Sequence, residues 1–267
     1  MKNILKKIVD KKKEKIKLYK KKYSINEILN NIKEINNSVD FINEIKKRTE
    51  NKKVSIIAEI KKASPSAGII VNDFNPLAIA KLYVENGASC LSVLTEEDFF
   101  DGNLAYIKKI KKNYLIPVLC KDFFIDTYQV PLAKSYGADC ILIILSAVDI
   151  SLAKDLYQAA NDLNISTLIE VHSEKEAEAA LVFEKSIIGI NNRNLDTLEI
   201  SLNTSIKLSK ILNSHKLPLI SESGFKSSDD IKFIIKNAQI HNFLIGESLL
   251  KSDNISLKLK EISQITL

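Results

Sequence analysis

The sequence contains no tryptophan, one methionine and five prolines among 267 residues, and it has no long apolar run. A membrane-spanning helix needs roughly 18 or more consecutive apolar residues, and no stretch of the chain approaches that length. The lysine-rich beginning also lacks the apolar segment of a secretory signal peptide. Hydrophobic residues still make up 45% of the chain, enough to build a large core. We therefore expect a soluble, cytoplasmic protein with no membrane partner.

Cysteine and histidine are also sparse, and neither type is clustered. Cys90, Cys120 and Cys140 lie in or beside apolar runs, without a Cys-x-x-Cys pair and without histidine at metal-ligand spacing. We expect three buried, reduced thiols and no metal site. The histidines are scattered, at His172, His215 and His241, which gives no sign of a Ser-His catalytic triad. Any catalysis should then depend on lysine and glutamate.

Positive charge is concentrated at the start of the chain. The net charge is +6, and residues 1–22 contain eleven lysines against two acidic residues. A basic arm can bind nucleic acid, but this one offers only Tyr19 and Tyr23 for readout of bases. Apolar residues recur in the arm at helical spacing, at Ile4, Leu5, Ile8, Val9, Ile16, Tyr19 and Tyr23. We expect a helix packed against the rest of the protein, and no nucleic-acid partner.

After the arm, strand and helix patterns alternate to the end of the chain. Short apolar runs bounded by turn-forming residues are typical of buried strands. We predict eight strands, at 54–60, 90–94, 116–120, 139–144, 166–170, 187–191, 217–221 and 242–245. Eight alternating units with short connections favour an α/β fold in which a parallel sheet closes into a barrel. An open, doubly wound sheet is the alternative, although it would require no particular number of strands.

Capping residues indicate where several helices begin and end. A helical segment is predicted near 39–48, a second over 76–86 with Pro76 in its first turn, and a third over 173–183 with Ser173 as N-cap. Gly87 and Gly137 each stand between a helix and a strand, where a helix C′ position needs a positive φ.

Ionisable or amide side chains stand at five of the eight predicted strand ends. Glu59 and Lys61 are two residues apart, so on an extended chain their side chains point to the same side. The other four strand ends carry Lys121, Glu170, Asn191 with Arg193, and Glu222. The carboxyl ends of barrel strands meet at one face, so we predict that these side chains converge on one site. For any single strand end, a solvated loop charge is the simpler interpretation.

The chain has only seven glycines, and two of them follow the last two predicted strands. At this place in a barrel, backbone N–H groups and a helix N-terminus often hold a phosphate. Gly224 and Gly246 therefore predict a phosphorylated small substrate, and the segment IGES at 245–248 should begin the last helix. Ordinary turn glycines remain the alternative.

Seven sequence motifs together resemble the indole-3-glycerol-phosphate synthase family of tryptophan biosynthesis. In order they are AEIKKASPS, LTEEDFFDGN, PVLCKDFF, LIEVH, GINNRNLDTLE, SESG and FLIGESL, and the resemblance covers nearly the whole chain. It implies a single (β/α)8 TIM barrel domain over 1–267, with residues 1–50 as an N-terminal helical extension. It also implies a carboxy-lyase that closes the ring of 1-(2-carboxyphenylamino)-1-deoxyribulose 5-phosphate, with loss of CO2 and water. The product would be indole-3-glycerol phosphate. No metal or organic cofactor is implied, and we expect a monomer or weak homodimer.

The resemblance implies roles for the residues at the strand ends. Lys121 matches the general acid that protonates the ketone oxygen while the aromatic carbon attacks. Lys61 matches the lysine near the substrate carboxylate and the departing hydroxyl, and Glu170 matches the carboxylate that exchanges protons during dehydration. The supporting polar groups are Glu59, Asn191 and Glu222. Developing alkoxide charge needs a positioned cation or acid, and we expect repulsion between the two lysines to lower one lysine pKa.

The resemblance also implies a substrate-binding set. The phosphate contacts are Ser66, Gly224 and Gly246, with Ser223 and Glu247 acting through main-chain N–H groups. The apolar wall for the aromatic ring consists of Pro65, Phe100, Phe123, Leu142 and Leu195, and further polar contacts are Ser64 and Arg193. Two positions depart from the family pattern. Ala67 stands where many relatives have a basic residue, and Glu247 replaces a small residue, so its carboxylate should point away from the phosphate.

Another phosphate-binding barrel family is the closest competitor. Phosphoribosylanthranilate isomerase relies on a cysteine and an aspartate at early strand ends. The first predicted strand here offers Glu59 and Lys61 instead.

Overall fold

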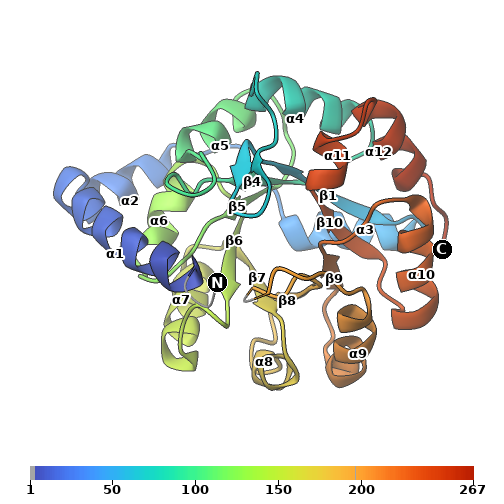
Figure 1. Cartoon of the computed structure of the whole chain (residues 1–267). Coiled ribbons are helices and arrows are strands. Elements are labelled where there is room, and N and C mark those ends of the chain that lie inside the picture. Colours follow the sequence, from blue (N-terminus) through green and yellow to red (C-terminus); the bar gives the residue numbers. More distant parts are fainter. Residues whose placement is uncertain (1–3, 196) are drawn as a thin grey trace.

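The computed structural model describes residues 4–195 and 197–267, and in this part of the chain eight parallel strands close into a barrel (Figure 1). Around the ring they are β1 (Ser55–Ile60), β4 (Cys90–Leu94), β5 (Val118–Lys121), β6 (Cys140–Ile144), β7 (Ser166–Val171), β8 (Ile187–Asn191), β9 (Leu219–Glu222) and β10 (Asn242–Ile245). β10 pairs with β1 and closes the ring. The predicted (β/α)8 barrel is confirmed. Residues 1–3 of the predicted extension lie outside the described residues.

Helices surround the ring of strands (Figure 1). They are α4 (Pro76–Glu85), α5 (Leu104–Lys111), α6 (Gln129–Ser135), α7 (Ile150–Asp162), α8 (Glu174–Ala180), α9 (Asn203–Ile211), the 3-10 turn η1 (Leu212–Ser214), α10 (Ser228–Ala238), α11 (Glu247–Leu250) and α12 (Ile255–Ser263). Three helices precede the barrel: α1 (Ile4–Lys22), α2 (Ile25–Lys33) and α3 (Phe41–Glu50). No described helix combines the length and apolar character needed to cross a membrane.

Two predicted strands begin later than expected because of proline. The strands predicted from residues 116 and 217 each contain a proline at their second position, Pro117 and Pro218. Proline has no N–H to donate to the sheet, so β5 begins at Val118 and β9 at Leu219. Two features are missing from the sequence prediction. These are α2 and the short antiparallel pair formed by β2 (Ala63–Ser64) and β3 (Gly68–Ile69).

The predicted helix starts at Ser173 and Pro76 are confirmed, but α8 ends at Ala180, before the predicted residue 183. The hydroxyl of Ser173 accepts the N–H of Glu176 at the start of α8, and Pro76 is the first residue of α4. Gly87 and Gly137 have φ values of 98° and 96°, the left-handed conformation that glycine adopts without steric cost.

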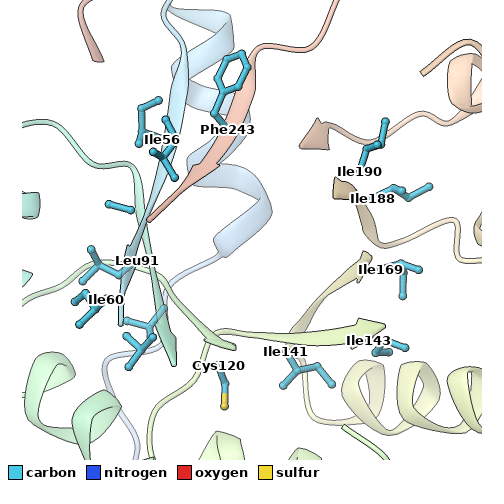
Figure 2. Packing of buried hydrophobic residues seen from close by; sticks show 14 of the residues in the cluster. Ile56, Ile60, Leu91, Cys120, Ile141, Ile143, Ile169, Ile188, Ile190 and Phe243 are labelled. Atoms are coloured by element: carbon cyan, nitrogen blue, oxygen red, sulfur yellow. The ribbon is translucent and has the colours of Figure 1, made fainter. Parts of the chain in front are cut away.

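Alternation along the strands builds two apolar layers. In β6, Ile141 and Ile143 belong to the layer between strands and helices, whereas Cys140, Leu142 and Ile144 point into the barrel. Figure 2 shows the outer layer, to which neighbouring strands contribute side chains that face away from the barrel axis. Apolar side chains fill the inner layer below the carboxyl ends of the strands.

α3 closes the opposite end of the barrel. Its residues Phe41 and Ile45 are fully buried within the inner apolar layer. Just before α3, the N–H of Val39 donates to Asp139 at 2.8 Å, and Asp139 directly precedes β6. The three cysteines are buried free thiols, as predicted.

The predicted arm helix is confirmed as α1, and its apolar face packs on the body of the protein. Ile16 forms a buried cluster with Ile28 of α2, Tyr128 and Leu132. Lys12 lies on the same face of α1 and is only 6% exposed, which the sequence analysis did not predict.

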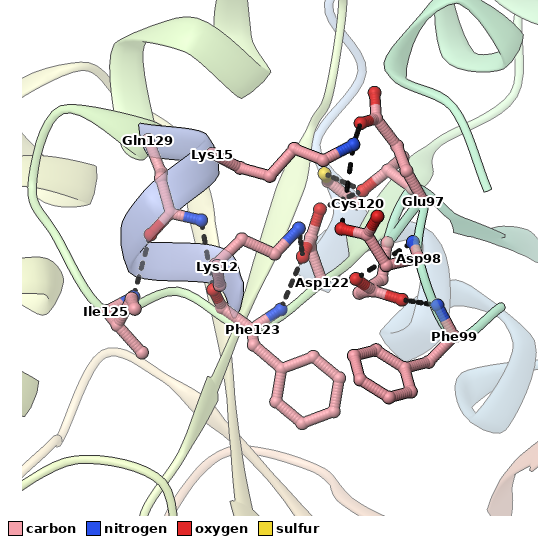
Figure 3. Close-up of polar contacts among 12 residues, drawn as sticks. Lys12, Lys15, Glu97, Asp98, Phe99, Cys120, Asp122, Phe123, Ile125 and Gln129 are labelled. Carbon is pink, nitrogen blue, oxygen red and sulfur yellow. Dashed lines mark hydrogen bonds and ion pairs between the residues drawn. The ribbon is translucent and has the colours of Figure 1, made fainter. Parts of the chain in front are cut away.

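Lys12 forms a buried ion pair with Asp122, the residue that follows β5. The Lys12 Nζ and Asp122 Oδ1 atoms lie 2.6 Å apart (Figure 3). Asp122 also accepts the Phe123 N–H at 2.7 Å and the Thr95 hydroxyl at 2.8 Å. The α1 helix thereby fixes the loop that begins directly after Lys121.

A second group of contacts ties α1 to the loop after β4. Lys15 pairs with Glu97 and, at 3.5 Å, with Asp98. The hydroxyl of Tyr19 donates to Glu97 at 2.6 Å. The extension therefore docks through apolar and charged contacts together.

Replacing Lys12 with methionine should destabilise the protein. Removing one partner of a buried ion pair leaves the other charge uncompensated, at a cost of about 3 kcal/mol or more. Urea unfolding at equilibrium measures the change. Lys17→Met, at an exposed position of the same helix, is the control and should cost less than about 0.5 kcal/mol. Equal stabilities of the two variants would contradict this interpretation.

Candidate active site

A cavity of about 530 Å³ lies at the carboxyl ends of the barrel strands. Every residue that the sequence analysis assigns to the site lines it: Glu59, Lys61, Ser64, Pro65, Ser66, Phe100, Lys121, Phe123, Leu142, Glu170, Asn191, Arg193, Leu195, Glu222, Ser223, Gly224, Gly246 and Glu247. The predicted convergence of the strand ends therefore occurs. The role of each residue stays a prediction.

Lys121, at the end of β5, lies between two carboxylates. Its Nζ atom is 2.8 Å from Glu170 Oε2 on β7 and 2.8 Å from Glu222 Oε2 on β9. The amide of Asn191 on β8 donates to Glu170 Oε1 at 3.3 Å. Four neighbouring or near-neighbouring strands thus build one polar cluster, and both carboxylates are almost fully buried.

The pKa of Lys121 shifts in the direction opposite to the expected one. Burial alone would lower the pKa of this ammonium, but the charges of Glu170, Glu222 and Glu59 outweigh burial and raise the pKa above its ordinary value. The expectation that repulsion between lysines lowers a lysine pKa is therefore wrong for Lys121. The carboxylates around it are closer and more numerous than the cations.

The two carboxylates beside Lys121 differ in acidity. Burial and repulsion from Glu170 together raise the pKa of Glu222 to about 7. The attraction of Lys121 offsets only part of this rise. For Glu170, burial acts in the same direction, but the attraction of Lys121 and His172 outweighs it and lowers the pKa. At neutral pH Glu170 is a carboxylate, whereas Glu222 can carry a proton. Such a pair, with separated pKa values, is suited to acid–base chemistry.

Glu59 and Lys61 form a second ion pair across the cavity mouth. The Lys61 Nζ and Glu59 Oε1 atoms lie 2.5 Å apart. Their spacing of two residues brings the side chains to the same side of the chain, as predicted. Unlike Glu170 and Glu222, this pair comes from a single strand end.

Two glycines make room for the buried carboxylates. A methyl group on Gly189 in β8 would overlap Glu222 Oε1, and one on Gly246 would overlap Glu59 Oε1. Gly189 was not assigned to the site, although it lies within a predicted strand. Whether Gly246 also allows the backbone to approach a phosphate stays a prediction.

Glycine and serine residues after the last two strands form the other end of the cavity. Ser223 and Gly224 have φ values of 67° and 95°, so the chain turns sharply after β9. The four-residue helix α11 begins at Glu247, but the last helix of the chain is α12. The expectation that IGES begins the last helix is therefore wrong.

The carboxylate of Glu247 is paired with basic side chains. It lies 2.7 Å from Lys251 Nζ and 3.6 Å from Arg193 Nη2. Lys251 and Lys226 also line the cavity and add positive charge that the sequence analysis did not include. Glu247 itself lines the cavity, and its direction relative to a bound phosphate stays a prediction.

Aromatic and aliphatic side chains line the opposite wall. The rings of Phe100 and Phe123 have centroids 6.2 Å apart and planes inclined by 38°. From α1, Ile4, Leu5 and Ile8 also line the cavity. Among the described residues, no group of three or more histidine, cysteine, aspartate or glutamate side chains is arranged to hold a metal ion.

Comparison with known proteins identifies the family. Residues 5–262 match the model of the family described as indole-3-glycerol phosphate synthase. The chain is 43% identical over 223 residues to the indole-3-glycerol phosphate synthase of Polaromonas naphthalenivorans (strain CJ2), which covers 84% of each protein. It is 41% identical over 252 residues to that of Aliarcobacter butzleri (strain RM4018), covering 94% of this chain and 95% of the relative. The chain belongs to the indole-3-glycerol phosphate synthase family.

As a member of the indole-3-glycerol phosphate synthase family, the protein is an enzyme of tryptophan biosynthesis. It is a carboxy-lyase that acts on a phosphorylated small molecule. The resemblance drawn from the seven sequence motifs is thus confirmed.

Solved structures at low identity share the barrel. Tryptophan synthase subunit alpha from Legionella pneumophila str. Paris has a TM-score of 0.61 at 15% identity, covering 85% of this chain and 98% of that chain. Phosphoribosylanthranilate isomerase from Thermotoga maritima, the family considered as competitor, has a TM-score of 0.56 at 10% identity, covering 78% and 96%. These likenesses concern the fold alone. Cys90 and Cys120, at early strands, do not line the cavity of this indole-3-glycerol phosphate synthase family member.

Sequence reasoning missed one histidine of the cluster. The His172 Nε2 atom lies 3.2 Å from Glu170 Oε1, a contact that the scattered positions of the histidines in the sequence do not indicate. The motif LIEVH contained the signal, because Glu170 and His172 are two residues apart at a strand end.

Replacing Gly189 with alanine should slow the enzyme by displacing Glu222. A small misplacement of a catalytic group can lower the rate by about 10²-fold, so we expect a reduced kcat in steady-state assays of the folded variant. Gly137→Ala, at a positive-φ position between α6 and β6, is the control. It should lower thermal stability and leave kcat unchanged. A Gly189→Ala variant with the kcat of the unmodified protein would show that Glu222 does not need this space.

Proposed function

We propose that the cavity binds 1-(2-carboxyphenylamino)-1-deoxyribulose 5-phosphate and closes its ring, with Lys121 as the general acid. The observation that carries this proposal is the contact of the Lys121 ammonium with both Glu170 and Glu222, at 2.8 Å each, in a cavity at the carboxyl ends of the strands. Family membership supplies the overall reaction. The contacts support the assignment of its steps to particular residues.

Lys121 acts where negative charge develops. Attack of the aromatic carbon on the ketone turns the ketone oxygen into an alkoxide, which a nearby ammonium stabilises and protonates. Because its neighbours raise the pKa of Lys121, the side chain enters the reaction fully protonated. An alkoxide is more basic than an amine, so proton transfer to it is favourable despite the raised pKa.

Lys61 and Glu170 serve the later steps. Lys61 holds the substrate carboxylate before CO2 leaves and stabilises the departing hydroxyl during dehydration. Its partner Glu59 keeps the ammonium in place at 2.5 Å. Glu170, which is ionised because Lys121 and His172 outweigh the effect of burial on its pKa, accepts a proton in the dehydration step. Glu222, with a pKa near 7, and Asn191 orient these groups.

The substrate spans the cavity from the glycine-rich end to the apolar wall. Its phosphate binds at the ends of β9 and β10 through Ser66, the main-chain N–H groups of 223–224 and 246–247, and the charges of Arg193, Lys226 and Lys251. Its aromatic ring packs against Pro65, Phe100, Phe123, Leu142 and Leu195, and Ser64 supplies a further polar contact. Because one end of the cavity is polar and the other is apolar, the substrate can bind in only one orientation.

The protein acts as one domain over 1–267, in the cytoplasm and as a monomer or weak homodimer, without a nucleic-acid or membrane partner. Several arm lysines are engaged by the barrel, which supports this part of the proposal. Lys12 pairs with Asp122, Lys15 with Glu97 and Lys20 with Asp126. Charges used in this way contribute less to an anion-binding surface.

Substitutions of Lys121 test the general-acid role. Lys121→Ala should lower kcat and kcat/KM together by about 10²- to 10⁴-fold, since the lost interaction forms mainly in the transition state. Lys121→Arg should restore little, because guanidinium keeps the charge but does not release a proton near neutral pH. Steady-state kinetics of product formation measures both.

Lys226→Ala provides the contrast for binding. Lys226 lines the glycine-rich end of the cavity, so its loss should raise KM more than it lowers kcat. If Lys121→Arg turned over at a near-normal kcat, fixed positive charge would suffice and the general-acid role would be wrong.

A further inference from the structure

His172 lies directly behind the site, between two carboxylates. Its Nε2 atom is 3.2 Å from Glu170 Oε1, and its Nδ1 atom is 3.3 Å from Glu176 Oε2. The imidazole is only 10% exposed and does not line the cavity. His172 therefore touches Glu170 without reaching a substrate.

Glu176 is itself held firmly. Its Oε2 atom accepts the main-chain N–H of His172 at 2.8 Å, and its Oε1 atom accepts the Ser173 hydroxyl at 3.0 Å. The N–H of Glu176 in turn donates to the Ser173 hydroxyl, which caps the start of α8. The carboxylate cannot turn away from His172 without giving up these bonds.

Glu170 consequently has a cation on each side. Lys121 contacts its Oε2 atom at 2.8 Å, whereas His172 approaches its Oε1 atom, which also accepts the amide of Asn191. Among the described residues, His172 Nε2 has no hydrogen bond of good geometry, and its 3.2 Å contact with Glu170 Oε1 is an ion pair when the ring is doubly protonated. Two carboxylates facing one imidazole favour its doubly protonated form.

The charge of His172 follows from its neighbours. Burial would lower the pKa of the imidazole, but Glu170 and Glu176 outweigh burial and raise the pKa to about 9. Glu222 on β9 and Lys121 on β5 lie on the other side of Glu170. From α9, which packs against α8, Lys207 pairs with Glu174.

We propose that His172 is a positioning residue, whose ring, clamped by Glu176, fixes the orientation of Glu170, the proposed proton acceptor. This rests on the proposed role of Glu170 in dehydration. The imidazolium contributes a fixed charge and transfers no proton itself. Glu176 contacts the ring directly, and Ser173 acts through its hydrogen bonds to Glu176.

The proposal requires a particular dependence of rate on pH. Below pH 9 the imidazole is charged and Glu170 has both cationic neighbours. As the pH rises through about 9, the imidazole loses its proton, and Glu170 loses the positive charge that lies beside its Oε1 atom. The rate should therefore fall on the alkaline side, with an apparent pKa near that of His172.

His172→Gln tests the proposal through kcat, KM and their pH profiles. A misplaced Glu170 should lower kcat at neutral pH by up to about 10²-fold, with little change in KM because His172 does not touch the substrate. The alkaline limb near pH 9 should disappear. Glu176→Gln keeps the imidazole but removes one carboxylate that raises its pKa, so the limb should move to lower pH. This second variant also tests the proposal if His172→Gln does not fold.

Two further variants separate the possible failures. His241→Gln removes a half-buried imidazole outside the cavity and should leave the profile unchanged. Glu170→Gln should be slow at every pH, and a normal rate for it would overturn the proposed role of Glu170. Suppose that Glu170→Gln is slow but His172→Gln keeps a normal kcat and an unchanged alkaline limb. This result would overturn only the role of His172. An alkaline limb that does not move in Glu176→Gln would count against it equally.

Discussion

The ammonium of Lys121 holds two nearly buried carboxylates together at the floor of the cavity. Glu170 and Glu222 are 2% and 1% exposed, and each lies 2.8 Å from Lys121 Nζ. Two carboxylates this close in a dry environment repel one another, and each loses hydration. Lys121 offsets both effects for Glu170 but only in part for Glu222, while the carboxylates keep its ammonium protonated. The charge state of each group thus depends on the other two.

The surrounding fold holds these three charged groups in contact. The three charges come from strands β5, β7 and β9, which only a closed parallel barrel brings together at one end. Gly189 leaves the space that Glu222 occupies. Asp122, directly after Lys121, is bound by Lys12 of α1, so the N-terminal helix reaches the end of β5 through one buried ion pair. His172 continues the alternation of charges outward from Glu170.

Much of the fold could be predicted from the sequence, because strand patterns are local. The residues that line the cavity could be predicted as well, because the carboxyl ends of parallel strands in a barrel meet at one face. Glu59 and Lys61, Lys121, and Glu170 were predictable from their places after apolar runs. The sequence also contains the reason why β5 and β9 begin later than predicted, since Pro117 and Pro218 have no N–H to donate to the sheet. The Lys12–Asp122 pair was not, because nothing local relates residues so far apart. The raised pKa of Lys121 likewise depends on three-dimensional distances that no spacing encodes.

This charge cluster is proposed to close the five-membered ring that turns the substrate into an indole. The chain contains no tryptophan, so the protein contributes no indole fluorescence of its own. The most direct measurement is therefore the fluorescence that follows mixing of micromolar protein with 1-(2-carboxyphenylamino)-1-deoxyribulose 5-phosphate. We expect indole fluorescence to rise in step with CO2 release. Fluorescence no higher than that of the protein-free mixture would contradict it.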